Sequence, residues 1–469
     1  MVSMEGLDMV VSCLALGLLF CFFVLKWNEF RYSRRGVPPG TMGWPFFGET
    51  NEFLKLGPQF MRNQKARYGS VFKSHILGSP MVVSTDAELN RFILLNEAKG
   101  LVPGYPQSMV DILGSRNIAA VHGSTHRYIR NNLLSLVGTP VVKDRLLPRL
   151  DKHMRLFLSN WDGKTIDIQQ KTKEMAFAMA FKQIAEVESS SIYDSFKCEF
   201  DKFLIGTLSL PVNLPGTNYH LGFKSRADVV KTLTELMEKR RGATAGTYDD
   251  MLAHLLRDGT TRYGLTDEDI IDQIITILYS GYETMSTTSM MAVKYLHDHQ
   301  EALQELRDEH FAIRKRKAAE EPIDWNDIKS MRFTRAVVFE TLRLATVING
   351  VLRKTTQDVQ LNGFTVPKGW RIYVYLREIN YDPLLYPEPL KFNPWRWLQD
   401  EKLESNNYVL LFGGGSRLCP GKELGIVKVA TFLHYLVTTY RWEEIGGEKM
   451  LEFPRVKAPN GYHVNVMKI

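Results

Sequence analysis

Five long segments of this chain repeat apolar residues at spacings of three and four, which is the period of an amphipathic helix. Shorter runs that are rich in β-branched and aromatic residues, VFKSHI, MVVS, VQLNGFTV and WRIYVYLRE, predict strands of a small sheet. The fold class is therefore predicted to be mainly α with a minor β part. The five helical segments are residues 173–186, 227–240, 266–299, 333–345 and 420–440.

Cysteine usage and charge restrict the compartment and the partners of the chain. The four cysteines among 469 residues are scattered, and no Cys-x-x-Cys pair suggests zinc. The main body is therefore expected in a reducing compartment.

The formal net charge of +7 is modest for this length, and the basic residues are not interleaved with aromatic residues as in a nucleic-acid groove. No nucleic-acid partner is expected.

Residues 1–36 predict a membrane anchor with a basic flank. Met9–Leu25 carries no charged residue and is at the short end of what spans a bilayer. Glu5 and Asp8 precede it where a cleaved signal peptide would carry positive charge. The basic residues that follow fit the cytoplasmic side of a membrane. The sequence thus predicts one N-terminal transmembrane helix, single-pass, with the large domain that follows in the cytosol.

The rest of the chain is predicted to contain a hinge and one large domain. Residues 37–47 include adjacent prolines, which fix extended geometry and stop a helix from continuing. Residues 48–469 show no internal repeat, no low-complexity stretch and no long Gly/Ser linker. We therefore assign 37–47 to a proline-rich hinge and 48–469 to a single domain.

The stretch FGGGSRLCPG at residues 412–421 places a cysteine before an apolar helix. A lone cysteine is usually a small buried residue, but the N-terminus of a helix favours a thiolate. Such a thiolate could be a nucleophile, a redox thiol or a metal ligand. Arg417 suits an anionic ligand beside Cys419, and the glycines let the backbone approach a flat, bulky group. Dinucleotide and phosphate-loop patterns do not fit, so haem ligation by cysteine remains.

The same stretch matches the pattern F-x-x-G-x-R-x-C-x-G and resembles the haem-binding signature of the cytochrome P450 superfamily. The resemblance implies the cytochrome P450 fold and a haem-thiolate monooxygenase domain over 48–469. It also implies heme b, iron protoporphyrin IX, with the thiolate of Cys419 as axial metal ligand. The pattern residues, which the resemblance makes cofactor-binding, are Phe412, Gly415, Arg417, Cys419 and Gly421.

Other stretches match further parts of the family's pattern. Glu340 and Arg343 in FETLR, with Arg396 in FNPWRW, resemble the family's structural Glu-Arg-Arg triad. In HGSTHRYIR, Arg130 matches an arginine that contacts the haem propionates, whereas His126 departs from the tryptophan common there. Arg353 in VLRKT matches another propionate-binding arginine.

SGYET lies inside the helix predicted over 266–299, where a buried glycine and a buried glutamate both need a reason. A polar helix face is the simple explanation. In a haem-thiolate protein the stretch resembles the catalytic oxygen-activation site. There Gly281 makes room for dioxygen, and Glu283 and Thr284 deliver protons.

The likeness covers nearly the whole chain and extends to the plant brassinosteroid-6-oxidase family. GPQFMRNQKARYGSVFKSHILG, KGLVPGYPQSMVDILG and RLATVINGVLRKTTQDVQLNGF are among the similar stretches. The resemblance implies oxidation of carbon six of a brassinosteroid, for example 6-deoxocastasterone to castasterone through the 6-hydroxy intermediate. The alternatives are another sterol or terpenoid substrate, a haem-thiolate enzyme that rearranges peroxides, and a non-catalytic haem protein.

The resemblance also implies partners and a location. No flavin or nucleotide motif is present, so NADPH electrons are expected to arrive through a separate NADPH-cytochrome P450 reductase. Dioxygen is the second substrate. The expected location is the endoplasmic reticulum membrane, to which the N-terminal helix would attach the protein.

Overall fold

A computed structural model of the chain describes residues 4–97, 99–186, 190–244, 247–258, 265–318, 320–400 and 402–469. Close packing divides the chain into two compact units. The first comprises Met1–Gly104 and Gly350–Glu378, and the second comprises Tyr105–Asn349 and Ile379–Ile469. The predicted class, mainly α with a minor β part, is confirmed.

The first unit contains a five-stranded sheet in the order β1-β2-β8-β5-β3. β2 and β8 pair in parallel, and the other neighbours pair antiparallel. β6 and β7 form a hairpin whose turn residues, Asn362 and Gly363, both have positive φ, as a tight two-residue turn requires. The strands are β1 (Val71–Ile76), β2 (Ser79–Ser84), β3 (Leu101–Pro103), β5 (Gly350–Thr355), β6 (Val359–Leu361), β7 (Phe364–Val366) and β8 (Arg371–Tyr375).

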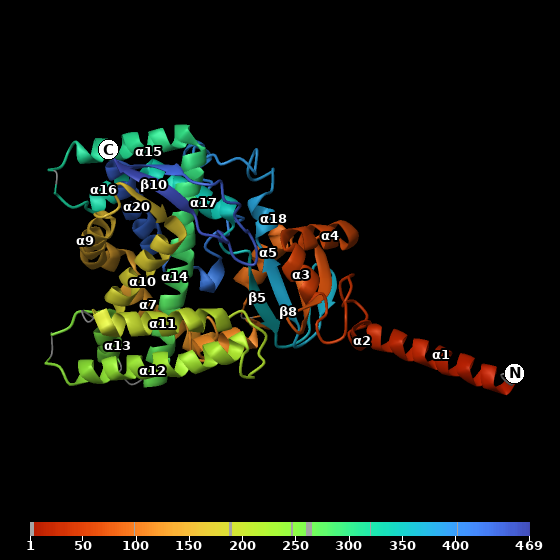
Figure 1. The fold of residues 1–469 in the computed structure, drawn as a ribbon. Coiled ribbons are helices and arrows are strands. Elements are labelled where there is room, and N and C mark those ends of the chain that lie inside the picture. The colour runs from red at the N-terminus through yellow and green to blue at the C-terminus, as the bar shows by residue number, and fades with distance from the viewer. Residues whose placement is uncertain are drawn as a thin grey trace. The chain divides into compact units, whose positions relative to one another are not determined.

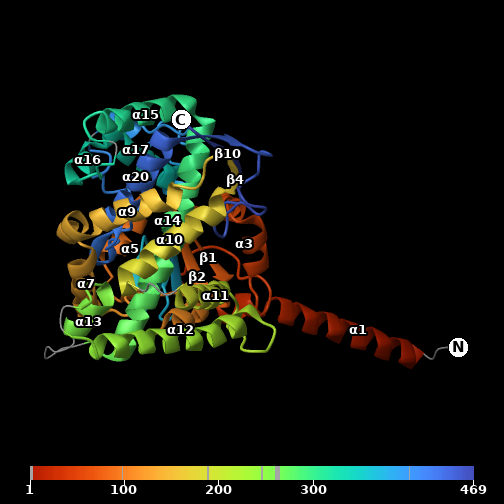
Figure 2. The same ribbon diagram turned by 60° about the vertical axis from the view of Figure 1, so that its left-hand side comes forward.

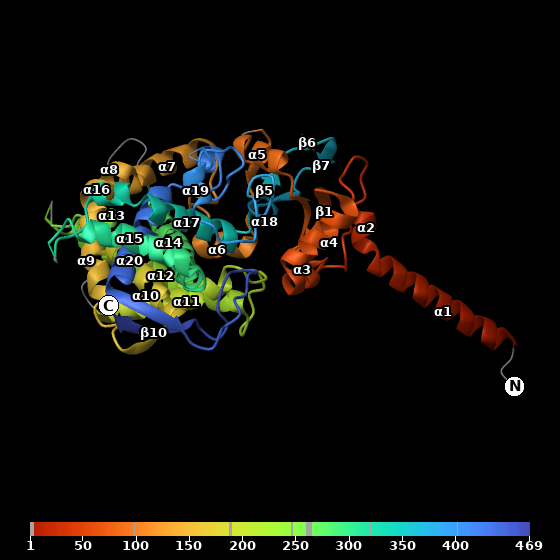
Figure 3. The same ribbon diagram turned by 90° about the horizontal axis from the view of Figure 1, so that it is seen from above.

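The helices of the first unit accompany this sheet, with α3 and α4 beside it in Figure 1. They are α1 (Met4–Leu25), α2 (Trp27–Arg31), α3 (Thr50–Leu56), α4 (Pro58–Tyr68) and α5 (Ala87–Leu95). α1 leads directly into α2 (Figure 3). Among the described residues, none of the helices combines the length and the apolar character that crossing a membrane requires.

The proline-rich residues 37–47 are tied to α2 by hydrogen bonds. The side-chain amide of Asn28 donates to the Trp44 carbonyl at 2.6 Å. The Met42 N–H donates to the Glu29 carboxylate, also at 2.6 Å. The extended segment therefore folds back onto the short helix that precedes it.

The second unit is mainly helical, with a three-stranded antiparallel sheet in the order β4-β10-β9. The strands are β4 (Lys164–Asp167), β9 (Tyr440–Glu444) and β10 (His463–Lys468). α18 (Arg377–Asn380) links the first unit to the second in sequence. The helices are α6 (Gln107–Leu113), α7 (Gly123–Val137), α8 (Thr139–Val141), α9 (Leu147–Leu158), α10 (Ile168–Ala185), α11 (Ser190–Gly206), α12 (Asn218–Arg241), α13 (Met251–Asp258), α14 (Asp267–Asp298), α15 (Gln300–Arg314), α16 (Trp325–Ser330), α17 (Arg332–Ala345), α19 (Arg396–Gln399) and α20 (Lys422–Thr439), with a π-helical turn at Val142–Leu146 and a 3₁₀ turn at Gly415–Arg417.

The long helix α14 is the centre of the second unit. It packs against α10, α17 and α20, and Figure 2 shows α10 beside it. Thr266 caps its N-terminus in a reciprocal arrangement with Asp269, which satisfies backbone N–H groups that have no partner within the helix. This cap places the start of α14 within one residue of the prediction.

Two predicted helices begin earlier than expected. The pattern predicted a helix from residue 173, whereas α10 begins at Ile168, because Asp167 caps the helix by accepting from the backbone N–H groups of Gln169 and Gln170. α12 begins at Asn218, capped by Thr217, rather than at 227. In α10 a polar first turn, which includes Gln169, Gln170 and Lys171, hides the apolar period.

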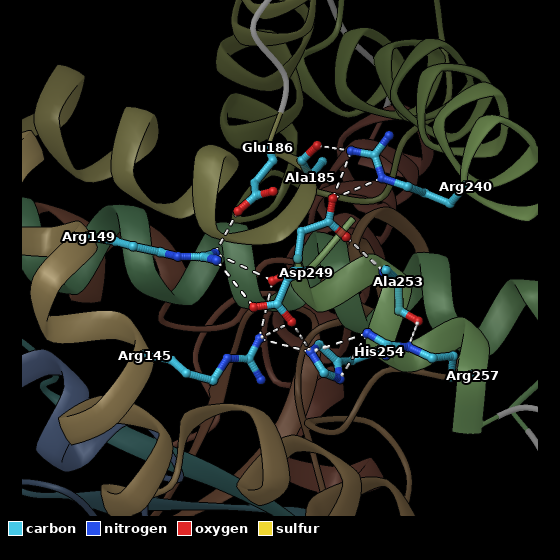
Figure 4. A network of polar contacts seen from close by, with 10 residues as sticks. Arg145, Arg149, Ala185, Glu186, Arg240, Asp249, Ala253, His254 and Arg257 are labelled. Carbon is cyan, nitrogen blue, oxygen red and sulfur yellow. Dashed lines mark hydrogen bonds and ion pairs between the residues drawn. The ribbon is translucent and has the colours of Figure 1, made fainter. Parts of the chain in front are cut away.

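Polar contacts hold the ends of several helices of the second unit together (Figure 4). Asp249 accepts from Arg145 at 3.1 Å and from Arg149 at 3.2 Å, which ties the start of α9 to the segment before α13. Next to it, Arg240 and Asp250 form a buried ion pair at 2.7 Å. Because both of these charges are buried, each depends on the other to remain compensated.

Candidate active site

The turn that carries Cys419 is closed by backbone hydrogen bonds. The Cys419 N–H donates to the Phe412 carbonyl at 2.9 Å, and the Leu418 N–H donates to the Gly415 carbonyl at 3.1 Å. Gly413 and Gly415 have φ of 76° and 64°, a conformation that favours glycine over other residues. The glycines thus let the chain turn back on itself and present the cysteine before α20.

The helix after the turn begins later than predicted. α20 starts at Lys422 rather than at Pro420, with Gly421 as its N-cap. The Gly421 N–H donates a hydrogen bond to the cysteine sulfur. Cys419 therefore lies just outside the helix and still uses a backbone N–H group at its entrance.

The surroundings of the Cys419 sulfur act on its pKa in opposite directions. Desolvation by the surrounding protein raises the pKa of the thiol, and this outweighs the lowering by the Gly421 N–H, Arg130 and Lys422. The side chain is nevertheless exposed. The thiolate at Cys419 stays a prediction, and a metal ion bound at the sulfur would displace the thiol proton.

Two predicted propionate ligands lie close to the cysteine. Arg130, on α7, is near enough to Cys419 and Arg417 to interact electrostatically with both, and burial lowers its pKa. The Arg417 guanidinium donates to the carbonyls of Ile118, at 2.8 Å, and Val121. The structure thus gathers two positive charges beside the sulfur.

His126 lies on α7 one turn before Arg130 and is buried, with 6% of its surface exposed. Arg353 belongs to the first unit, on β5. Its side chain is buried there and makes an ion pair with Glu97 at 3.8 Å.

Phe412 joins the turn to α17. Its ring packs edge-on against Phe339, with ring centroids 5.7 Å apart. The Lys422 ammonium lies 5.5 Å from the centroids of both rings, a cation–π arrangement. These contacts support the back of the cysteine turn with side chains from α17 and α20.

The three predicted catalytic residues lie together near the middle of α14. A β-carbon built at Gly281 would meet no heavy atom within 4 Å, so there is space beside the helix at this position. The Thr284 hydroxyl donates to the Ser280 carbonyl at 2.7 Å. The Glu283 carboxylate forms an ion pair with Arg455 at 3.5 Å. Glu283 and Thr284 therefore have different partners in this structure.

Arg455 is a residue of this site that the sequence analysis did not identify. It also donates to the hydroxyls of Tyr279, at 3.1 Å, and Thr207, at 3.2 Å. No motif marks it, because its partners come from distant parts of the chain. The only local feature of the sequence that marks this arginine is its place between two prolines in FPRVKAP.

Glu340, Arg343 and Arg396 form one buried cluster. The Glu340 carboxylate pairs with Arg343 at 2.8 Å and with Arg396 at 3.1 Å, and all three side chains are at most 6% exposed. Trp397 donates its indole N–H to the same carboxylate at 2.9 Å. The two arginines also donate to backbone carbonyls, those of Pro387, Glu388, Pro389, Lys391 and Asn380. The cluster thereby holds residues 380–397 against α17.

Comparisons with known proteins cover almost the whole chain. The cytochrome P450 family model matches residues 38–466. Cytochrome P450 85A of Phaseolus vulgaris is 64% identical over 97% of this chain and 98% of its own length. Cholesterol 22-monohydroxylase CYP90B51 of Trigonella foenum-graecum is 36% identical over 97% of this chain and 96% of its own length. The structure of the retinoic acid bound cyanobacterial CYP120A1 superposes with a TM-score of 0.84 at 26% identity, covering 92% of this chain and 99% of that one.

Proposed function

The chain belongs to the cytochrome P450 family, and from that premise we propose that it oxidises carbon six of 6-deoxo brassinosteroids. The proposed reaction converts 6-deoxocastasterone to the 6-hydroxy compound and then to the ketone castasterone. The observation that carries the substrate is the 64% identity to a cytochrome P450 85A over 97% of the chain. The stretches that resemble plant brassinosteroid-6-oxidases support the same substrate.

As a member of this family the protein is a monooxygenase with a haem-thiolate cofactor, and its electrons come from NADPH through a redox partner. When bound, the haem activates dioxygen so that one oxygen atom is inserted into the substrate and the other leaves as water. The residues near Cys419 fit this group, because they combine an exposed sulfur with two guanidinium groups that suit its carboxylates.

We assign the following roles to residues of the chain. Cys419 would hold the haem iron through its sulfur, and Arg130 and Arg417 would bind the propionates. Gly281 leaves room for dioxygen beside α14. Glu283 and Thr284 deliver protons, in keeping with their place on the same turn of that helix. His126 and Arg353 are proposed to bind the propionates as well. The proposed redox partner is NADPH-cytochrome P450 reductase.

The substrate is tested with purified full-length protein, the reductase and NADPH. We expect 6-deoxocastasterone to be consumed and the 6-hydroxy compound to appear before castasterone, because the second oxidation acts on the first product. Mass spectrometry of timed samples follows both products. If 6-deoxocastasterone is unchanged while another sterol or terpenoid is oxidised, the substrate proposal is wrong. Turnover of a peroxide without NADPH would instead support the rearranging enzyme.

We also propose that residues 1–36 attach the protein to the endoplasmic reticulum membrane with the remainder in the cytosol. Large apolar side chains of α1, among them Leu14, Leu18 and Phe20, are more than half exposed to solvent. Such a surface is stabilised by contact with lipid. Full-length protein in microsomes is expected to resist carbonate extraction, and a chain lacking residues 1–25 is expected to be released to a larger extent. Equal release of both would contradict the proposal.

A further inference from the structure

A cavity of about 190 Å³ lies between α9 and α10, and none of its lining residues belongs to the candidate active site. The two helices contact each other and lie side by side in Figure 2. The deepest lining residues are apolar, because Leu146, Leu150 and Met179 are each at most 5% exposed. The cavity therefore offers an apolar surface to whatever enters it.

Two lysines, one from each helix, line the same cavity at its exposed side. They are Lys152 of α9 and Lys182 of α10, and both are exposed. In the part of the chain that the structure describes, neither ammonium group has a hydrogen-bond or ion-pair partner. Their two positive charges are therefore uncompensated at the opening of the cavity.

An ion pair forms another part of the cavity wall. The Arg149 guanidinium donates to the Glu186 carboxylate at 2.6 Å and to the Asp249 carboxylate at 3.2 Å (Figure 4). Of these three residues, Arg149 and Glu186 line the cavity. Glu186 is thus the one carboxylate in the lining and is already paired, so it does not neutralise the two lysines.

His153 lies between the two lysines in its electrostatic surroundings. It lines the cavity and is half-buried. Burial lowers the pKa of His153, and the ammonium groups of Lys182 and Lys152 lower it further. Both ammonium groups are therefore close to one imidazole, which makes this wall of the cavity electropositive.

Gln183 adds a hydrogen-bond donor that is not used by the protein. It lines the cavity, and its side-chain amide nitrogen is buried without a partner among the described residues. Buried donors are nearly always satisfied, so an unpaired one needs an explanation. An acceptor oxygen of a ligand in the cavity would supply the missing partner.

From these observations we propose that the cavity between α9 and α10 binds a small amphiphilic anion. Its ligand has a carboxylate or phosphate head group on a short aliphatic chain. The head group lies near Lys152 and Lys182 and accepts from Gln183, and the chain packs on the apolar residues beneath. An inorganic anion would leave the apolar residues uncovered, and a neutral lipid would leave the lysines uncompensated. The site is separate from the steroid reaction, and its occupation stabilises the contact of α9 with α10.

The inference is tested by titrating the full-length protein with octanoate and with octyl phosphate. The reporter is the methyl signal of Met179 in protein labelled with ¹³C at the methionine methyl groups, and a Met179→Leu variant assigns that signal. We expect a saturable shift with each amphiphile. Acetate, inorganic phosphate and 1-octanol should bind at least about tenfold more weakly, because each lacks the chain or the charge. The Soret band reports separately any binding near Cys419.

The double variant Lys152→Met, Lys182→Met should bind both amphiphiles about tenfold more weakly, since it loses two exposed ion pairs with the head group. Both lysines are exposed, so the fold should be retained, and urea unfolding checks this. The matched control is Lys143→Met, Lys171→Met. It removes the same charge from residues that do not line the cavity and should keep the affinity of the wild type.

The relative affinities also identify the source of the ligand. Tighter binding of octanoate assigns the site to free fatty acids, and tighter binding of octyl phosphate assigns it to phosphate esters of lipids. Equal affinity for acetate or inorganic phosphate would show that only a simple anion is recognised and overturns the inference. Equal affinity for 1-octanol overturns it as well. So does a Met179 signal that does not move, or a lysine double variant that binds like the control.

Discussion

The Cys419→Ala variant is expected to lose the red-shifted Soret band of the reduced, carbon-monoxide-bound protein. Alanine has no sulfur to bind the iron, whereas the thiolate is responsible for this spectrum in haem-thiolate proteins. Product formation should fall by roughly 10³-fold or more, the scale seen when a catalytic centre is removed. Difference spectra and timed product analysis measure both effects.

Cys198→Ala is the control for this experiment, because Cys198 is also an exposed free thiol but lies on α11, away from the turn. It should retain the spectrum and the activity. An unchanged Soret band in Cys419→Ala would remove this cysteine as the axial ligand. Loss of the band in Cys198→Ala alone would move the ligand to α11.

Glu340→Gln is expected to destabilise the second unit severely. The substitution leaves Arg343 and Arg396 buried without the carboxylate that pairs with both at 2.8 and 3.1 Å. Removing one partner of a buried ion pair costs about 3–5 kcal/mol. This is a large part of the about 5–15 kcal/mol by which folded domains are stable. Urea unfolding followed by circular dichroism should therefore show a much lower midpoint.

Glu388→Gln provides a comparison within the segment that the cluster holds. The Glu388 carboxylate is 71% exposed and lies 3.8 Å from the Lys391 ammonium. An exposed pair of this kind contributes about 0–1 kcal/mol, so the unfolding midpoint should hardly move. Similar midpoints for Glu340→Gln and Glu388→Gln would mean that the buried cluster does not stabilise the fold.

Features that depend on neighbouring residues could be predicted from the sequence. The period of apolar residues predicted α14 to within one residue at each end, and VFKSHI predicted β1 with its observed bounds. The glycine-rich turn before α20 was predicted as well, and its glycines Gly413 and Gly415 have positive φ in the structure. β3 and β10, by contrast, were not predicted, since each is stabilised by strands from remote parts of the chain.

The residues of the site also divide into those that the sequence identified and those that only the structure revealed. Residue types and spacing drew attention to Cys419 and Arg417, whereas the resemblance to the cytochrome P450 superfamily identified Arg130, Arg353 and the members of the Glu340 cluster. Only the tertiary structure brought Arg455 to Glu283 and raised the pKa of the Cys419 thiol. The physical reason is that ion pairing and desolvation depend on distances in space between residues far apart in the chain, and a local pattern contains no information about those distances.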